Sequence, residues 1–137
     1  MTTPGITEIS APLKKSGSVV LNASGNGVIT FDPDNAWQRW EVNTVIVSTN
    51  QASTASIVPT ATAALNTVDP VTMSQGNVRG GMSWSGNNDT LYGEQIDVGP
   101  ADFFSVVFQP PAGQSGATLA GVIAYAVVTG TKYTRRS

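Results

Sequence analysis

Clusters of turn-forming residues divide this sequence into segments that are too short for long helices. The clusters occupy 22–27, 32–35, 85–89 and 110–116 and are rich in Gly, Asn, Asp and Pro, which favour turns through their backbone preferences and side-chain hydrogen bonds. Between them lie short apolar or alternating segments, with many of the 16 threonines. Threonine is β-branched and packs well on a pleated sheet. The pattern therefore predicts an all-β chain.

Short strands, about eight in number and separated by turn signals roughly every dozen residues, indicate a β-sandwich or barrel. We favour a single sandwich of the jelly-roll or immunoglobulin-like type, since 137 residues suffice for one domain with its own core. Residues 61–65 could form one helical turn, and no long amphipathic helix is expected. The expected strands are 16–21, 28–31, 38–49, 56–61, 78–84, 91–92, 95–98, 102–109 and 117–130.

The segment 38–49 is the clearest strand. Its residues alternate in character, so that Trp40, Val42, Thr44 and Ile46 share one face. Because this face is mostly apolar and begins with the largest side chain, we expect it to lie in the core.

The segment 117–130 is apolar on both faces. Tyr125 lies on one face, whereas Val122, Ala124 and Ala126 lie on the other. A strand of this kind is either central in a sheet or covered by a second subunit. Residues 62–77 of the same chain could also cover this face. We expect Val122, Ala124 and Ala126 to lie at or near a subunit contact, which predicts a homo-oligomer or a lattice-bound subunit.

The two ends of the chain differ from the middle in their expected structure. Residues 1–15 include Pro4 and Pro12, which discourage regular structure, and we expect an extended N-terminal arm there. The β-sandwich domain is expected at 16–131, followed by a basic C-terminal tail at 132–137.

Five of the seven basic residues lie near the ends. This layout suits docking of the ends onto an acidic partner surface. Nucleic acid is not an expected partner, because binding it requires a broad basic face and a high pI, and the pI of this sequence is about 4.8. The basic residues expected at an interface are Lys14, Lys15, Lys132, Arg135 and Arg136.

The surface of the folded chain must be weakly charged. Charged residues make up 12% of the sequence and the net charge is −2, whereas soluble domains usually carry about 25% charged residues. A small net charge favours association over solubility. We therefore expect a protein that works inside an assembly, in preference to a monomer with a neutral polar surface.

The chain lacks histidine and cysteine, so it holds no Ser-His or Cys-His nucleophile pair and no thiolate metal site. The acidic turn at 32–35 does not begin an EF-hand loop, because no glycine follows at the sixth position and no glutamate at the twelfth. The acidic residues between 89 and 102 follow no sequence pattern that would place two carboxylates at the separation that glycosidases need. The stretch 117–128 is too short for a membrane helix. We expect no enzyme activity, metal, cofactor or membrane insertion.

Two tryptophans beside turns suggest an alternative function. Trp37 and Trp84 could present flat aromatic faces to the sugar rings of a host surface glycan. The alternative to a structural protein is therefore a carbohydrate-binding or adhesin module. Packing of the same two side chains at the ends of the sandwich is the explanation that we favour.

Two segments resemble small virion proteins, often called minor tail or minor structural proteins, of tailed phages of actinobacteria. The segments are residues 89–130 (DTLYGEQIDVGPADFFSVVFQPPAGQSGATLAGVIAYAVVTG) and residues 39–49 (RWEVNTVIVST). The resemblance implies a β-sandwich protein located in the virion, either tail-associated or capsid-decorating. It also implies that the partners are other virion proteins and copies of the chain itself.

Overall fold

The computed structural model describes residues 7–52, 54–68, 82–83 and 88–136. Within this part of the chain the only helical element is a single 3-10 turn, η1, so the all-β prediction is confirmed. The elements are β1 (Thr7–Val20), β2 (Gly27–Phe31), β3 (Gln38–Thr49), β4 (Thr60–Leu65), β5 (Met82–Ser83), β6 (Asn88–Val98), β7 (Phe104–Gln109), η1 (Gly116–Leu119) and β8 (Ile123–Arg136).

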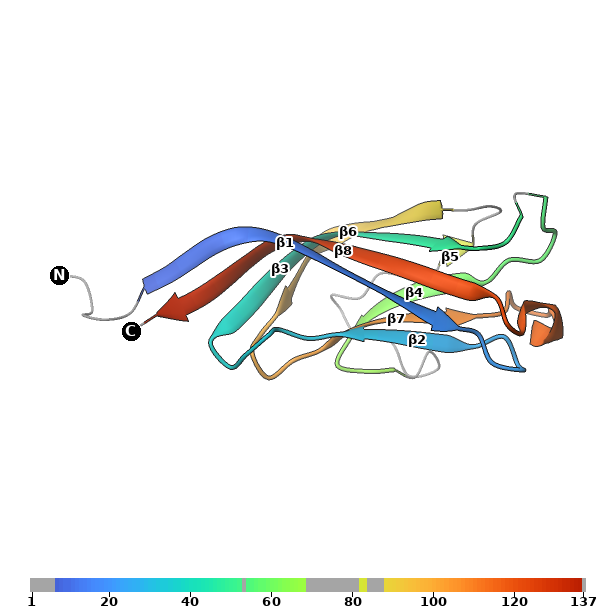
Figure 1. Ribbon diagram of the computed structural model, residues 1–137, viewed down its shortest axis with the longest axis horizontal. Helices are drawn as coiled ribbons and strands as arrows, with labels where there is room; N and C mark the ends of the chain where they lie inside the picture. The colour runs from blue at the N-terminus through green and yellow to red at the C-terminus, as the bar shows by residue number, and fades with distance from the viewer. Residues whose placement is uncertain (1–6, 53, 69–81, 84–87, 137) are drawn as a thin grey trace.

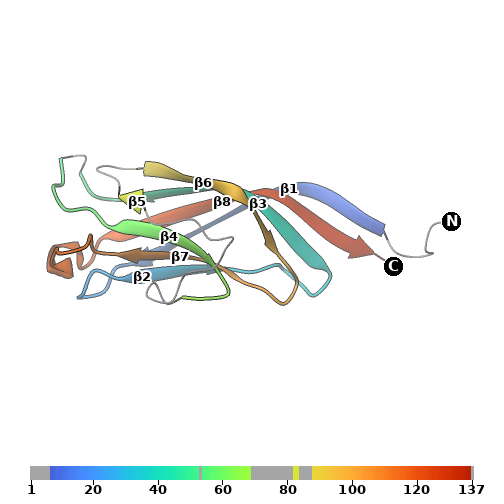
Figure 2. The same cartoon turned by 180° about the vertical axis from the view of Figure 1, so that it is seen from behind.

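The strands form two antiparallel four-stranded sheets in the orders β1-β8-β3-β6 and β2-β7-β4-β5. Figures 1 and 2 show the two sheets as packed layers. The first strand pairs with the last, the second with the seventh, the third with the sixth and the fourth with the fifth. The chain is thus one long hairpin rolled into two layers, which is the jelly roll. Of the two expected types of sandwich, the structure adopts this one.

A β-bulge in β3 changes which residues face the core. Trp40 and Val42 are buried, as predicted, but the register shifts between Val42 and Thr44. An extra residue turns all later side chains to the opposite face. Val47 is therefore fully buried, whereas Ile46, which we expected in the core, is 36% exposed.

Gly130 lies opposite the bulge, paired with Val42. A Cβ atom at position 130 would overlap the carbonyl oxygen of Glu41 and press on the backbone nitrogen of Asn43. Since both obstacles are backbone atoms, the strands can approach this closely only at a residue without a side chain.

The two faces of β8 are reversed relative to the sequence prediction. Ala124 and Ala126 are fully buried between the sheets, and Val122 packs partly buried against the same core. Ala124 and Ala126 therefore cannot form a surface contact with a neighbouring subunit, whereas a contact at the partly buried Val122 stays a prediction. Small side chains fit here because large ones, led by Trp40, fill the space between the layers. The outward face of β8 carries Tyr125 instead, with 38% of the residue exposed.

The described parts of the expected arm and tail are strands. Residues 7–15 belong to β1 and residues 132–136 to β8, and the two strands pair along their whole lengths, from Thr7 with Arg136 to Val20 with Ile123. Their outer ends project past the rest of the sandwich (Figure 1). Pro12 is compatible with β1 because β1 is an edge strand of its sheet.

Two smaller expectations also change. Residues 61–65 lie within strand β4 and form no helical turn, and the last strand begins at Ile123 because Gly116–Leu119 form a 3-10 turn. Within the expected strand 78–84, only Met82 and Ser83 are described, as β5.

We predict that Trp40→Ala destabilises the fold by roughly 3–5 kcal/mol, the usual cost of truncating a large buried aromatic residue. Trp37→Ala is the matched control, because Trp37 is 60% exposed and Trp40 only 1%. The control should change the free energy of unfolding by less than about 0.5 kcal/mol. Urea denaturation of both variants measures the difference, and equal losses would contradict the assigned core.

We also predict that Gly130→Ala destabilises the fold by about 1–3 kcal/mol or more, because its methyl group meets backbone that cannot move aside. Gly121→Ala is the comparison. Gly121 has a positive φ of 83° but open space around its Cβ position, so it loses only the roughly 1–2 kcal/mol of left-handed backbone strain. The two variants should also differ in their NMR spectra, since only Gly130→Ala should shift the amide signals of residues around the β3 bulge.

Candidate subunit interface

The outer face of the β1-β8-β3-β6 sheet carries an apolar patch at one end. Tyr125 lies at its centre, between Ser18 of β1 and Ser48 of β3. The apolar residues around Tyr125 come from three neighbouring strands, and the most exposed is Val20 at 60%. We define the apolar patch as Val20, Ile46, Ile123, Tyr125 and Val127.

No residue of the apolar patch carries a charge. Its border consists of serines and threonines, namely Ser16, Ser18, Thr44, Ser48 and Thr129, and the charged Lys14 lies just beyond this border, opposite Thr129. An apolar centre with an uncharged polar border is the usual layout of a protein contact, since charged residues are depleted at interface centres. A flat sheet face of this composition can therefore be dehydrated at little electrostatic cost.

The opposite end of the same face holds a charged network. The Arg39 guanidinium donates two hydrogen bonds, of 2.9 and 3.0 Å, to the Glu8 carboxylate and lies 3.5 Å from Glu41. The Tyr133 hydroxyl donates to Glu41 at 2.9 Å, and Arg39 stacks 4.1 Å from the centre of the Tyr133 ring. These contacts join β1, β3 and β8 where they extend beyond the other sheet.

The network shifts the proton affinities of its members. Hydrogen bonds from Arg39 hold the pKa of Glu8 below its usual value, and the same bonds raise the pKa of Arg39. The hydrogen bond to Glu41 raises the pKa of Tyr133. All three residues are exposed or half-exposed, so water screens these interactions and each contributes only modestly to stability.

The pairing of β1 with β8 brings the basic residues of the two ends together, but onto different faces. Lys14 is exposed on the outer face. Lys15, on the inner face, forms a 2.8 Å ion pair with Asp34, which holds the pKa of Asp34 below its usual value. Lys132 lies near the same carboxylate.

The last two basic residues lie at the end of β8. Arg135 stands opposite Glu8 and Arg136 opposite Thr7. Because neighbouring residues of a strand point to opposite faces, the five basic residues of the two ends do not form one basic surface. Their docking onto an acidic partner remains a prediction.

Of the two tryptophans expected to face a ligand, Trp37 is 60% exposed on the turn before β3. Its backbone nitrogen donates to Asn35 Oδ1 at 2.8 Å, and its carbonyl accepts from the Arg135 nitrogen at 2.7 Å, so the turn is fixed to β8. Trp84 lies outside the described residues. A two-tryptophan platform therefore rests on Trp37 alone.

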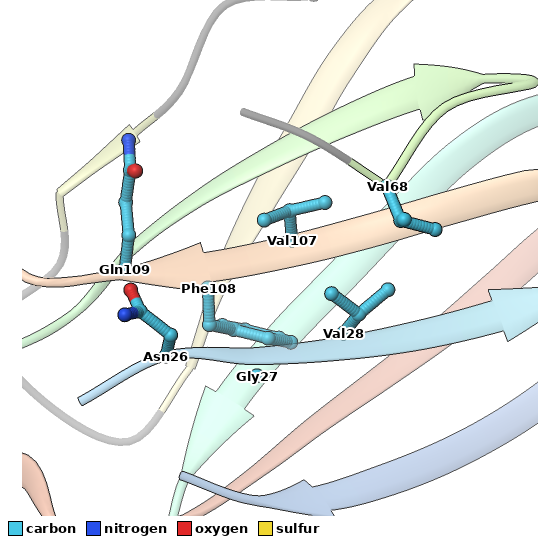
Figure 3. A pocket seen from close by; sticks show the side chains of 7 residues that line it. All are labelled: Asn26, Gly27, Val28, Val68, Val107, Phe108 and Gln109. Carbon is cyan, nitrogen blue, oxygen red and sulfur yellow. The ribbon is translucent and has the colours of Figure 1, made fainter. Parts of the chain in front are cut away.

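The second sheet has a pocket on its outer face, which the sequence analysis did not find. Its volume is about 390 Å³. Figure 3 shows Val28, Val68 and Val107 along it, with the amide side chains of Asn26 and Gln109 at one end. The pocket joins strands β2 and β7 to the segment after β4, so no local motif marks it.

The described residues offer neither a metal site nor a membrane-spanning helix. No group of three or more acidic residues there is placed to hold a metal ion. Likewise, the described part of the chain has no helix with the length and hydropathy needed to span a membrane.

Comparison with known proteins gives a likeness of fold. No family model and no curated protein sequence matches the chain. A structure of Turnip yellow mosaic virus matches with a TM-score of 0.52 and 6% identity, over 100% of this chain and 86% of that one. The acid-stable capsid structure of Helicobacter pylori bacteriophage KHP30 matches with a TM-score of 0.51 and 11% identity, over 94% of this chain and 92% of that one.

The charged network predicts a pH-dependent stability. Because the pKa of Glu8 is lowered in the folded state, its ion pair stabilises the fold above the usual glutamate pKa of 4.5 and is lost as the pH falls through the folded value. Glu8→Gln should therefore lower the melting temperature at neutral pH, and the difference from wild type should vanish in acid. High salt should also reduce it. A difference that persisted unchanged in acid would show that Glu8 acts through packing.

Proposed function

We propose that this chain is a structural subunit of a viral particle, held in the virion by contacts with copies of itself and with other virion subunits. The observation that carries the proposal is an eight-stranded jelly roll with an uncharged apolar patch on its outer sheet face. This fold builds many viral shells, and the patch supplies a surface for protein contact.

The choice rests on surface chemistry, because the jelly roll also occurs in proteins of other functions. The apolar patch is better suited to another protein than to a polar small molecule. The low net charge of −2 permits many copies to pack closely without strong mutual repulsion. The two structures of similar fold come from a plant virus and from a phage capsid, which favours a place in or on the capsid over a place in the tail.

Glycan binding is the second candidate, supported by the exposure of Trp37. One exposed indole can stack on a sugar ring, but carbohydrate sites also need polar groups that converge on the ring's hydroxyls. Glycan-array binding that is lost in Trp37→Ala would favour this function. The assembly function predicts no loss of association in the same variant.

The structural function predicts that the purified chain associates into large, regular particles or oligomers at high concentration. Sedimentation velocity and negative-stain electron microscopy measure this directly. Tyr125→Asp should weaken association strongly, because it buries a carboxylate at the centre of the apolar patch without a partner. Ala36→Asp adds the same charge on an exposed turn and should associate like wild type. A wild-type chain that stays monomeric at every concentration would refute the proposed function.

A further inference from the structure

The two outer faces of the sandwich carry different features. Tyr125, the largest side chain of the apolar patch, lies on the first sheet with 38% of the residue exposed, and the pocket lined by Val28, Val68 and Val107 lies on the second. The core residues of both sheets point between the layers, so these two features face away from each other. One copy therefore cannot bring them together, whereas two copies can.

The sizes of the two features agree. A cavity of about 150 Å³ is enough to hold a benzene molecule, and the pocket has a volume of about 390 Å³. A phenol ring therefore fits, with room left for part of a neighbouring valine or isoleucine side chain of the apolar patch.

The chemistry of the two features also agrees. The exposed parts of Val28 and Val68, above the buried Val107, give the pocket an apolar lining that suits the faces of an aromatic ring. A buried phenol hydroxyl requires a hydrogen-bond partner, and the amide groups of Asn26 and Gln109 at one end of the pocket can each donate or accept. None of the three valines or two amides carries a charge, which matches the uncharged border of the apolar patch.

The arrangement is not self-complementary, and this decides the symmetry of the contact. A protruding residue on one face and a hollow on the other give a head-to-tail contact, in which each copy offers one of each. Such a contact repeats from copy to copy, and it closes into a ring where the rotation between copies permits or continues as an open filament. A contact between two apolar patches would stop at a dimer.

We propose that Tyr125 of one copy of this chain inserts into the pocket beside Val68 of the next copy and joins the subunits head to tail. The inference rests on the proposed function and names its principal contact.

The apolar patch spans three strands and about five residues along them, which is an area of roughly 240 Å² from ordinary strand spacings. Stable interfaces bury about 800 Å² on each partner, so each contact is weak by itself and an assembly needs many of them.

Complementation between two variants tests the contact. Tyr125→Asp removes the protruding group, and Val68→Asp, at a residue that is 48% exposed, blocks the hollow. Each variant alone should lose association at least roughly tenfold, since buried aromatic anchors dominate such contacts. Mixed in equal amounts, they keep one intact contact, Tyr125 of the Val68→Asp chain in the hollow of the Tyr125→Asp chain. They should form dimers and nothing larger.

Disulfide trapping gives a second readout that does not depend on large assemblies. The chain has no cysteine, so Tyr125→Cys and Val68→Cys introduce single thiols. Under mild oxidation a mixture of the two should form mixed dimers faster than Tyr125→Cys forms dimers with itself or with Ala36→Cys. Circular dichroism on every variant confirms that the fold is retained.

Each alternative outcome is decisive. If Val68→Asp assembles like wild type while Tyr125→Asp does not, the apolar patch contacts another surface and the head-to-tail contact is wrong. If the wild type assembles but the thiols pair no faster than with Ala36→Cys, this contact is wrong and the proposed function stands. If neither assembly nor preferential pairing is seen, both fail.

Discussion

The pairing of the first strand with the last is the contact on which the rest of the fold depends. β1 and β8 are in register over 14 residues, from Thr7 with Arg136 to Val20 with Ile123. Because every other hairpin pair is nested inside this one, its register aligns both ends of the chain with β3 in the middle of the sheet. Pairing of segments this distant in sequence requires the loop between them to close, which costs conformational entropy. Folds dominated by such long-range pairs therefore fold slowly. The ion pairs of Glu8 with Arg39 and of Lys15 with Asp34 connect β1 to β3 and to the turn that precedes β3.

The bulge in β3 gives the outer face its character. Without the extra residue, Ile46 would point into the core and Val47 outward, in line with Trp40. The bulge is possible because Gly130 leaves room for the backbone of β3. It therefore separates the charged network, on one side of the shift, from the apolar patch on the other. One backbone irregularity serves both the core and the surface.

The predictable part of this structure was the part with local causes. The turn clusters and the spacing of Trp40 and Val42 were sufficient to indicate an all-β sandwich and part of its core. The bulge was not predictable, since it depends on a strand that is distant in sequence. The faces of β8 could not be assigned because both are apolar, so the packing of larger side chains decided that Ala124 and Ala126 lie inside. The pocket joins three distant segments and has no local signature.

The longest edge of the sandwich is protected against pairing with another chain, which supports the association through a sheet face that we propose. β1 is an edge strand of 14 residues, and long free edges invite pairing with another chain. Pro12 lacks a backbone donor, and Lys14 and Lys15 place charge on the same strand, which are the usual protections against such pairing. No residue of the apolar patch itself carries a charge, although the patch lies on the same sheet. A protected edge beside an uncharged apolar surface therefore favours contacts between faces, as proposed above, over contacts between edges.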